Sequence, residues 1–290
     1  LYEYRWHRSK SEKKKFIDIQ SVKNINEIIN KKIIVWDEQA IGDTIQFSRF
    51  IVDLLKYTKK ITLVVNSKLK DLLSVCYQDL TIEDYNSIDP KNFEYQIPLC
   101  SIPYLLKINK IEEINYKKFI IPIDKKIDKD LFNKNKLNIG ITWSGNPNYI
   151  RDTFRSIPFD NFKEIIKIKN IRFFKLFKGT KPDEVSILNN HNVVDLGEKS
   201  FRELSDYILR LDLVISSDTS IIHLSGSLNV PTVMLLNYNS DWRWFNYKYS
   251  TPWYPSVQIL KQEKLGDWTS VFTKLKIMIE HLKKIKKLND

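Results

Sequence analysis

Cysteine is scarce in this sequence, and no stretch is apolar for long. Two of the 290 residues are cysteines, Cys76 and Cys100, and both lie in apolar surroundings. So few cysteines argue against a disulfide framework and favour a reducing compartment, and their spacing fits no metal site. No apolar run reaches the ~18 residues of a membrane-spanning helix, and no secretory signal peptide is present. We therefore predict a cytoplasmic protein that is not integral to a membrane.

Histidine and methionine are also rare. The four histidines are too dispersed for a metal-ligand cluster: His7, His191, His223 and His281. We therefore expect no metal and no other cofactor. Both methionines are internal and the chain begins at Leu1, which indicates a fragment of a longer protein or a processed chain.

The charge is strongly positive but spread along the chain. The formal net charge is +12, and the lysines are scattered except at Lys13–Lys15 and in the basic run 283–287. A nucleic-acid-binding surface needs a concentrated basic patch with interleaved aromatic residues, so we expect no nucleic acid as a partner. An anionic nucleotide donor or an acidic partner is compatible with this charge.

Short apolar runs alternate with segments of helical period. Hydrophobic residues make up 42% of the sequence, which is enough for a sizeable core. We predict strands at residues 32–36, 60–65, 95–99, 137–142, 171–177, 211–215 and 231–236, the last of these being the final strand. We predict helices at residues 43–57, 68–75, 159–168, 201–210, 221–228 and 269–288. This alternation indicates an α/β fold with parallel strands covered by helices.

A polar and charged segment without a clear period, residues 124–136, marks the predicted domain boundary. The predicted parts are an N-terminal arm or linker (1–30), two Rossmann-like domains (31–125 and 126–268) and a C-terminal amphipathic helix (269–290). Two such domains with a cleft between them bind ligands at the carboxyl ends of their strands. The candidate loops are therefore residues 37–43, 143–155, 177–180, 216–223 and 237–244.

The most informative local pattern is a strand, turn and helix over residues 211–228. The apolar run 211–215 predicts a buried strand, residues 216–220 are small and polar, and a helix follows from Ile221. The free N–H groups and positive dipole of a helix N-terminus favour a phosphate or diphosphate there. Asp218 would repel a phosphate, so it either caps the helix or holds a sugar hydroxyl. An ordinary N-capped helix is the alternative interpretation.

Several motifs at these loops occur in the order of a known family. They are Trp36–Arg49, Gly140–Pro147, Arg155–Pro158, Asp218–His223 and Asp241–Trp244, followed by Ser250–Pro255 and Gly266–Trp268. Together they resemble the glycosyltransferase module that follows tetratricopeptide repeats in bacterial proteins. That module is similar to the heptosyltransferase family (glycosyltransferase family 9) and, more distantly, to O-GlcNAc transferases.

The resemblance implies a GT-B fold, with two Rossmann-like parallel-sheet domains and a cleft between them. It implies a metal-independent glycosyltransferase that moves a sugar from a nucleotide-diphosphate donor to a protein or surface-glycan hydroxyl. It also implies an upstream repeat region and is compatible with a peripheral position at the inner membrane. Two alternatives remain: an ADP-heptose-dependent heptosyltransferase of lipopolysaccharide type, and a catalytically silent nucleotide-sugar or peptide-binding module.

Residues of the first domain are candidates for the acceptor side. Asp43 matches the Gly–Asp motif of the heptosyltransferases, whose aspartate is the proposed base; a helix N-cap is its alternative role. Gly42 lets the backbone approach a ligand closely. Glu38 is a second candidate carboxylate, although it is otherwise expected to be solvated. Gln46 can reach the acceptor from the following helical turn.

The phosphate turn and its helix supply further candidates. Thr219 and Ser220 would meet the diphosphate, and Asp218 the sugar or a ribose. His223 lies four residues after Thr219, on the same helical face, and is a candidate catalytic residue that donates to phosphate or orients Asp218. A packed, structural histidine is the alternative.

Other loops complete the candidate donor site. Ser144, Gly145 and Asn146 form a second anion-binding loop or, alternatively, a plain turn before a proline. Arg155 can grip phosphate oxygens bidentately, the alternative being a surface ion pair. Lys178 occupies a position where the related enzymes place donor contacts. Arg243 can contact phosphate while the neighbouring tryptophans stack on sugar or base, the alternative being that these aromatics only pack.

Overall fold

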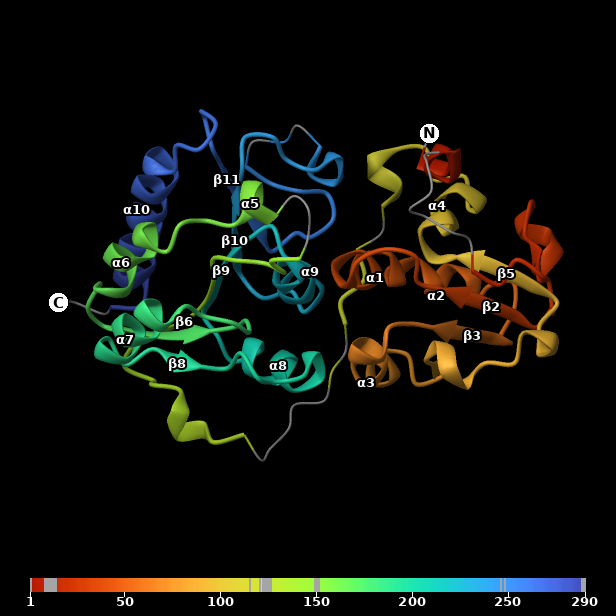
Figure 1. The fold of residues 1–290 in the computed structure, drawn as a ribbon, viewed down its shortest axis with the longest axis horizontal. Helices are drawn as coiled ribbons and strands as arrows, with labels where there is room; N and C mark the ends of the chain where they lie inside the picture. Colours follow the sequence, from red (N-terminus) through yellow and green to blue (C-terminus); the bar gives the residue numbers. More distant parts are fainter. Residues whose placement is uncertain are drawn as a thin grey trace. The chain divides into compact units, whose positions relative to one another are not determined.

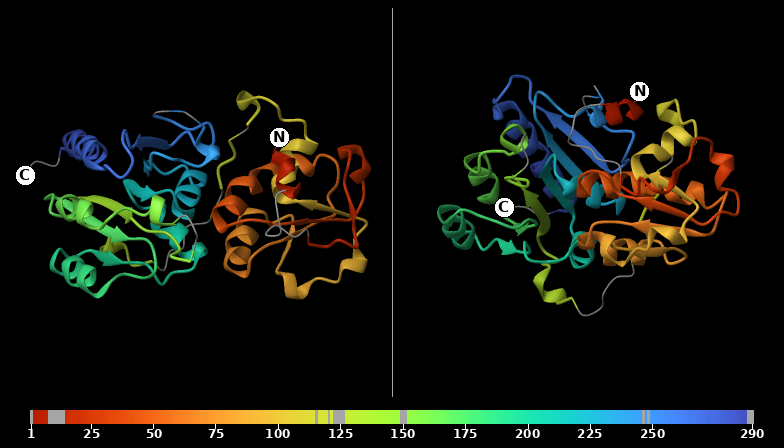
Figure 2. Two further views of the ribbon diagram at one scale, coloured as in Figure 1. Left: turned by 45° about the horizontal axis from the view of Figure 1, so that its top comes forward. Right: turned by 45° about the vertical axis from the view of Figure 1, so that its right-hand side comes forward.

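The computed structural model describes residues 2–7, 15–114, 116–119, 121, 127–148, 152–245, 247 and 249–287. The chain divides into two compact units, Leu1–Pro122 (unit 1) and Ile123–Asp290 (unit 2) (Figure 1). Each is a parallel sheet with helices, seen from two other directions in Figure 2, and this confirms the predicted α/β class. Part of the predicted boundary segment, residues 124–126, lies outside the described residues.

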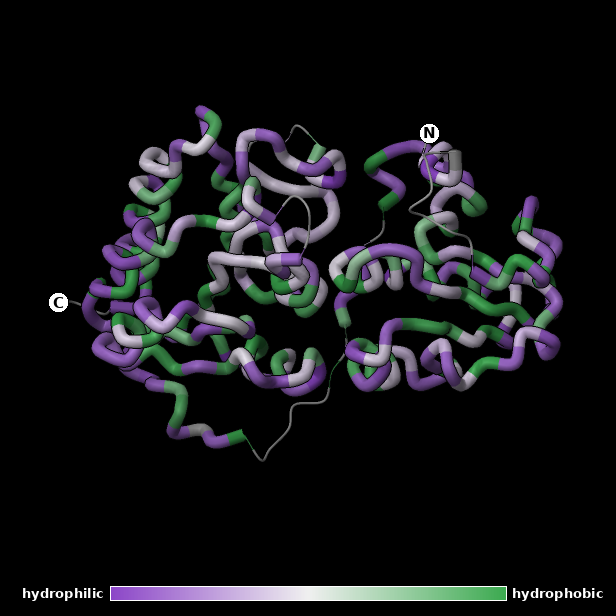
Figure 3. Tube along the Cα trace, viewed as in Figure 1, coloured by the Kyte–Doolittle hydropathy of each residue, from purple (hydrophilic) through white to green (hydrophobic). Residues whose placement is uncertain are grey.

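Unit 1 contains a sheet of five strands in the order β1-β5-β2-β3-β4. The strands are β1 (Gln20–Ser21), β2 (Ile33–Trp36), β3 (Ile61–Val64), β4 (Thr81–Glu83) and β5 (Tyr95–Pro98), and every pair is parallel. The central strands β2 and β3 are fully buried and stand out as hydrophobic in Figure 3. They were predictable because short, branched apolar runs suit a parallel strand covered on both faces. The very short β1 and β4 were not predicted.

The long helix predicted after β2 is instead a series of short pieces. They are α1 (Ile41–Phe47), the 3₁₀ turn η3 (Ser48–Phe50) and α2 (Ile51–Leu54). The Ser48 hydroxyl donates to the Ile45 carbonyl (3.0 Å) and Arg49 Nε to the Gln46 carbonyl (2.8 Å). A serine hydroxyl that bonds back to the preceding helical turn bends a helix, and Ser48 is the residue at which α1 gives way to the 3₁₀ turn.

The remaining helical segments of unit 1 are short. They are α3 (Ser67–Cys76), α4 (Ile102–Leu105), and the 3₁₀ segments η1 (Tyr2–His7), η2 (Ile25–Ile28), η4 (Tyr85–Ser87), η5 (Pro90–Asn92), η6 (Leu99–Ser101) and η7 (Ile111–Glu113). The η1 segment packs against β2 and α1, because Trp6 lies 6.1 Å from Trp36 and Tyr2 stacks on Phe47 at 6.4 Å, both between ring centroids.

Unit 2 contains a sheet of six strands in the order β11-β10-β9-β6-β7-β8. The strands are β6 (Leu137–Thr142), β7 (Ile171–Lys175), β8 (Val194–Asp195), β9 (Leu213–Ser217), β10 (Thr232–Leu236) and β11 (Val257–Lys261), all parallel. Two predictions were wrong here. The strand expected at 211–215 begins at Leu213 and extends through two buried serines, and β10 is followed by a further strand, β11.

Helices cover both faces of this sheet. They are α5 (Asp152–Arg155), α6 (Asp160–Ile166), α7 (Pro182–Asn190), α8 (Phe201–Ile208), α9 (Ser220–Ser227) and α10 (Thr269–Ile285), with 3₁₀ segments η8 (Lys129–Leu131) and η9 (Trp242–Trp244). The apolar face predicted for α10 packs into the core of this unit through Val271, Phe272, Leu275, Met278, Ile279 and Leu282. Ile285, expected on the same face, is 64% exposed. The predicted end of that helix, Leu288, lies outside the described residues. Within the described chain, no helix combines the length and apolarity needed to span a membrane.

Candidate functional site

The strand order of unit 2 marks one place for a ligand. From β6 the chain moves outward through β7 and β8, and it then crosses to β9 and continues through β10 and β11. Strands β6 and β9 are neighbours, with Thr142 beside Ser216. In open α/β sheets, ligands bind outside the carboxyl ends of the two strands at which the order reverses. The loops that follow β6 and β9 therefore form the candidate site.

Arg155 joins these loops. Its Nε donates to Asp152 Oδ1 at 2.9 Å, and its Nη1 donates to the backbone carbonyl of Asp218 at 3.2 Å. Asp152 also accepts a hydrogen bond from the Ser156 hydroxyl (2.7 Å), which in turn accepts the Gly145 N–H (3.2 Å). The Arg155 side chain is 23% exposed, so a cation reaches the surface where the strand order reverses.

Gly145 is required by this arrangement. A Cβ at this position would lie 2.4 Å from Arg155 Nη2 and 2.6 Å from Asp152 Oδ1. Of its neighbours in the predicted anion loop, Ser144 is partly buried and Asn146 is exposed. Asn146 Oδ1 accepts the Asn148 N–H at 3.1 Å, which is the plain turn of the alternative interpretation. The glycine thus makes room for Arg155, whereas Asn146 shapes the turn.

The Asp218 carboxylate is surrounded by groups that act on its charge. Burial raises the pKa of Asp218 to about 6; a hydrogen bond from Trp244 and the nearby Arg155 and Arg243 lower it, while Asp241 raises it further. For Asp218 we predicted either a helix cap or a contact to a sugar hydroxyl. The structure contradicts the first of these two roles. Thr219 is the N-cap of α9, because its hydroxyl accepts the Ile221 N–H at 3.3 Å.

The hydroxyls at this sheet edge differ in how well they are satisfied. Thr219 Oγ1 lies 3.1 Å from Ser216 Oγ, so it is held within the turn, and Ser220 follows as the first, partly exposed residue of α9. Thr142 and Ser217 end strands β6 and β9, and their buried hydroxyls find no hydrogen-bond partner among the described residues. Unsatisfied buried groups are rare in folded proteins, and each needs an explanation such as a ligand or ordered water.

His223 is packed beneath the turn. The residue is 6% exposed, its Nδ1 lies 2.9 Å from the Tyr254 hydroxyl, and its ring stacks on Trp244 with 5.3 Å between ring centroids. Tyr254 is fully buried against Gly226, where a Cβ would lie 2.5 Å from its Cγ. This is the packed histidine of the alternative interpretation, and its catalytic role stays a prediction. Trp244 connects the stack to Asp218.

Arg243 lies next to the same carboxylate. Its Nη1 and its backbone N–H both donate to Asp241 Oδ1, at 2.7 and 3.0 Å. Its guanidinium lies 5.3 Å from the centroid of the Trp242 ring, which is 48% exposed, whereas Trp244 is buried. Of the aromatics that flank Arg243, one therefore packs and the other remains on the surface.

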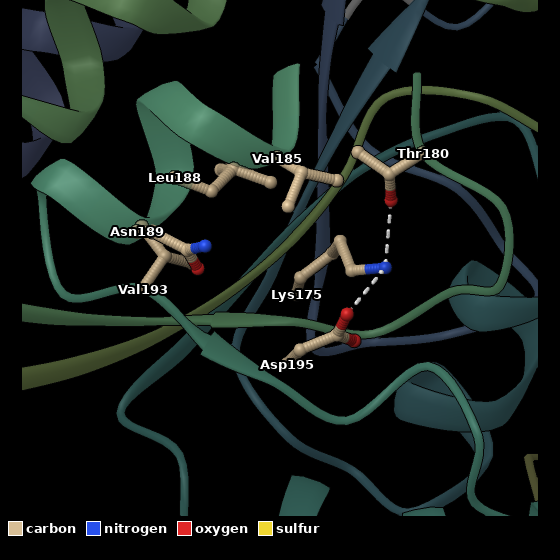
Figure 4. A pocket seen from close by; sticks show the side chains of 7 residues that line it. All are labelled: Lys175, Thr180, Val185, Leu188, Asn189, Val193 and Asp195. Atoms are coloured by element: carbon tan, nitrogen blue, oxygen red, sulfur yellow. Dashed lines mark hydrogen bonds and ion pairs between the residues drawn. The ribbon is translucent and has the colours of Figure 1, made fainter. Parts of the chain in front are cut away.

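Lys175 and Lys178 contrast in their surroundings: Lys175 is the last residue of β7, and Lys178 lies in the loop that follows. Lys178 forms an exposed ion pair with Glu198 at 2.9 Å. Lys175, which the sequence reasoning missed, is buried and contacts Asp195 Oδ2 (2.9 Å) and Thr180 Oγ1 (2.8 Å), beside a small cavity lined by α7 (Figure 4). The sequence did contain a signal for Lys175, because a lysine at the end of a buried apolar strand needs a partner for its charge. Its bonds hold the loop in place.

In unit 1, the predicted acceptor-side residues lie in the loop between β2 and α1 and in α1 itself. Asp43 is not the helix N-cap of the alternative interpretation, because that position is taken by Ala40. Asp43 lies in the first turn of α1, where its Oδ2 accepts the Ala40 N–H at 3.1 Å, and Gly42 precedes it in the helix. The expectation that Glu38 is solvated was wrong. Its side chain is 2% exposed, pairs with Arg5 and accepts the Cys100 N–H at 2.9 Å. Burial raises the pKa of Glu38, opposed by the bonds from Arg5 and Cys100.

Gln46 is the remaining predicted acceptor contact. It is completely buried in α1, and neither its amide nitrogen nor its amide oxygen has a hydrogen-bond partner among the described residues. Its role toward an acceptor stays a prediction. No group of three or more potential metal ligands occurs within the described part of the chain.

Comparisons with known proteins place this fold. No protein-family model matches the chain. The protein FlbA of Caulobacter vibrioides is 21% identical over 272 residues, which cover 83% of this chain and 45% of FlbA. The chain thus spans about half the length of this curated relative.

Solved structures are similar over most of their length. A glycosyl transferase family 9 protein from Veillonella parvula has a TM-score of 0.60 at 13% identity, with 86% of this chain and 90% of that chain covered. The ADP-heptose lipopolysaccharide heptosyltransferase II of E. coli has a TM-score of 0.58 at 12% identity, with 87% and 99% covered. The E. coli heptosyltransferase TibC in complex with ADP-D-β-D-heptose has a TM-score of 0.55 at 11% identity, with 89% of this chain and 78% of that chain covered. The chain shares the GT-B fold of these glycosyltransferases.

Proposed function

We propose that this chain is a metal-independent glycosyltransferase that moves a sugar from a nucleotide-diphosphate donor to a hydroxyl of a protein or glycan. The observation that carries the proposal is the junction of Arg155 with Asp218 where the strand order of unit 2 reverses. The GT-B fold of its structural neighbours supports the same reaction class. An upstream repeat region remains part of the proposal.

The donor diphosphate is proposed to bind at the N-terminus of α9. Arg155 and Arg243 lie close to Asp218 there, and the N-terminus of a helix carries a partial positive charge that favours an anion. Charge develops on the diphosphate as the bond from the anomeric carbon to its oxygen breaks, and fixed cations and helix N–H groups stabilise this charge. With these groups in place, the transfer is proposed to proceed without a metal ion.

The sugar is proposed to contact Asp218. This carboxylate is ionised above about pH 6, and an ionised carboxylate accepts hydrogen bonds from sugar hydroxyls. The unsatisfied hydroxyls of Thr142 and Ser217 are further candidates for polar contacts to a ligand or its ordered water.

The acceptor hydroxyl is proposed to lose its proton to Asp43. As the acceptor oxygen bonds to the anomeric carbon and the diphosphate leaves, the proton passes to the Asp43 carboxylate. A single displacement of this kind inverts the anomeric configuration. The hydrogen bond from Ala40 restrains the carboxylate at the start of α1, which favours a fixed geometry for proton transfer.

ADP-heptose is the donor that the comparisons favour. Both E. coli neighbours are described as heptosyltransferases, one with ADP-heptose in its name and one in complex with ADP-D-β-D-heptose. A heptosyltransferase of lipopolysaccharide type is therefore the second candidate function.

Calorimetric titration with ADP-, GDP-, UDP-, dTDP- and CMP-sugars and the free nucleotides tests the proposal. We expect one nucleotide to bind, and Arg155→Met to weaken this binding by at least about tenfold, because charge-assisted bonds to phosphate contribute about 1.5–3 kcal/mol each. Lys163→Met, which removes an exposed ion pair with Asp160 in the same unit, is the control and should leave affinity unchanged. Binding of none of these compounds would overturn the proposal in favour of a silent peptide-binding module.

A further inference from the structure

The strand order of unit 1 also reverses once, between β2 and β5. From β2 the chain proceeds outward through β3 and β4, and β5 then pairs with the other side of β2. A ligand would be expected outside the carboxyl ends of these two strands. This place is taken by the chain itself. Arg5 of η1 contacts Glu38, which follows β2, and Ser101, which follows β5.

Arg5 uses its whole guanidinium in this position. Its Nε and Nη2 donate to the two oxygens of Glu38 at 2.7 and 2.9 Å, and Nη2 also donates to Ser101 Oγ at 2.7 Å. Its Nη1 donates to Glu3 Oε1 at 2.7 Å and to the Tyr2 carbonyl at 3.2 Å. With 6% of the residue exposed, this is a buried, bidentate ion pair with additional bonds from both terminal nitrogens.

Aromatic rings enclose the guanidinium. Its central carbon lies 4.7 Å from the Tyr2 ring centroid and 4.4 Å from that of Trp6. Those rings in turn contact Phe47 of α1 and Trp36 of β2. The η1 segment is therefore attached to the strand that precedes the Glu38 loop and to the helix that follows it.

The Glu38 loop is the one that leads to Asp43. On one side of Glu38, Asp37 accepts the Asn66 N–H at 2.8 Å and a hydrogen bond from the Tyr85 hydroxyl. On the other side, Ala40 donates to Asp43. Glu38 takes its cation, Arg5, from a segment 33 positions away in the sequence. Asp37 is also paired with a cation from outside the loop, because Lys15 Nζ lies 3.8 Å from its Oδ1.

We propose that Arg5 is a positioning residue: with Glu38 it fixes the loop that places Asp43, and it fills the crevice between β2 and β5. The acceptor then meets unit 1 at the start of α1, not in that crevice. Displacement of η1 by a ligand is disfavoured, because it would leave the buried carboxylate of Glu38 without its cation. The role of Asp43 rests on the proposed function, whereas the restraint on the loop does not.

Hydrogen–deuterium exchange of the unliganded chain tests the restraint directly. In Arg5→Met we expect backbone amides of residues 37–43 and 100–102 to exchange at least about tenfold faster than in the unaltered chain, and those of α9 to be unchanged. Arg5→Lys should be intermediate, because a lysine keeps the charge without the planar fork. Lys31→Met, which removes the exposed pair with Glu94 in the same unit, is the control and should change neither region.

The double variant Arg5→Met/Glu38→Gln guards against simple unfolding, since it leaves no unpaired buried charge at position 38. We expect it to unfold at nearly the temperature of the unaltered chain while its 37–43 amides still exchange fast. Unchanged exchange in this folded variant would overturn the proposal.

Release of ADP from ADP-D-β-D-heptose, with water as the acceptor of the heptosyl group, supplies the second readout. We expect kcat of the double variant to fall at least about tenfold while the KM for the donor stays constant. A rise in kcat would overturn the proposal, because it would show that the segment obstructs the site. If the unaltered chain releases no ADP, the choice of donor or the proposed function fails, and the exchange experiment still decides the role of Arg5.

Discussion

The two units have sheets whose strand order reverses at one position each, yet the two positions are used differently. In unit 1 the ends of β2 and β5 are closed by Arg5, whose guanidinium is fully bonded to Glu38 and its neighbours. In unit 2 the ends of β6 and β9 are joined by Arg155, which remains 23% exposed beside Asp218. Topology therefore indicates where a ligand can bind, but the charges at the strand ends decide whether the chain itself occupies that place.

The strongest test of this difference is Asp43→Asn, which alters the chemistry proposed for unit 1 without touching its closed crevice. The side-chain amide oxygen that this substitution introduces can still accept the Ala40 N–H, so the helix start is preserved. We expect kcat to fall about 10²–10⁴-fold, the usual contribution of a general base, with nucleotide affinity unchanged. Steady-state kinetics and calorimetry measure the two effects.

Asp53→Asn is the matched control, because Asp53 forms an exposed pair with Lys56 in the same unit. An unchanged kcat in Asp43→Asn would show that Asp43 is not the base. The proposed catalytic role of unit 1 would then be lost, and only the proposed donor site of unit 2 would remain.

Asp218→Asn tests how much the buried charge of Asp218 lowers the free energy of unfolding. Because the pKa of Asp218 is raised to about 6 from 3.8, the folded chain binds its proton more tightly than the unfolded chain. Stability is therefore lost as pH rises from about 4 to 6, by about 3 kcal/mol at ~1.4 kcal/mol for each pKa unit. We expect Asp218→Asn to recover up to this amount at pH 7.5 and nothing below pH 4, in denaturant unfolding at each pH. An equal effect at both pH values would refute this origin.

Gly226→Ala tests the support beneath the same carboxylate. The added methyl group would lie 2.5 Å from Tyr254 Cγ, inside a buried stack that includes His223 and Trp244. Overpacking of this kind costs about 1–3 kcal/mol, so we expect a lower unfolding midpoint and weaker nucleotide binding. Lowered stability with unchanged binding would show that the stack does not position Asp218.

The smallest effect is expected for Lys178→Ala. Its ion pair with Glu198 is exposed, and such pairs contribute about 0–1 kcal/mol. We expect unfolding and nucleotide affinity to change by less than about 0.5 kcal/mol. A tenfold loss of nucleotide affinity in calorimetry would instead assign Lys178 to the donor site, as its resemblance to related enzymes implied.

Much of the architecture could be predicted, because parallel strands buried on both faces are recognisable as apolar runs. The strands ending at Trp36 and Thr142 were expected at nearly the observed bounds, and so was the position of the candidate loops just beyond them. The extension of β9 through Ser216 and Ser217 was not, because serines indicate a turn until their neighbours show that they are buried.

The contacts of the candidate sites were harder to predict, because they join distant positions. Glu38 was expected in solvent, since nothing near it in the sequence reveals that Arg5 reaches it. Likewise, nothing near Arg155 in the sequence reveals that its Nη1 reaches the backbone carbonyl of Asp218, 63 positions away. Local pattern predicts the strand ends, whereas the pairing of charges across them depends on the folded chain.

The attachment of η1 has a practical consequence for anyone who produces this protein in pieces. A truncation that starts at residue 31 would omit Arg5, the core residues Ile19 and Ile28, and the edge strand β1 that pairs with β5. The remaining fragment would expose an apolar sheet edge and an uncompensated acid. Expression plasmids for unit 1 should therefore include residues 2–30.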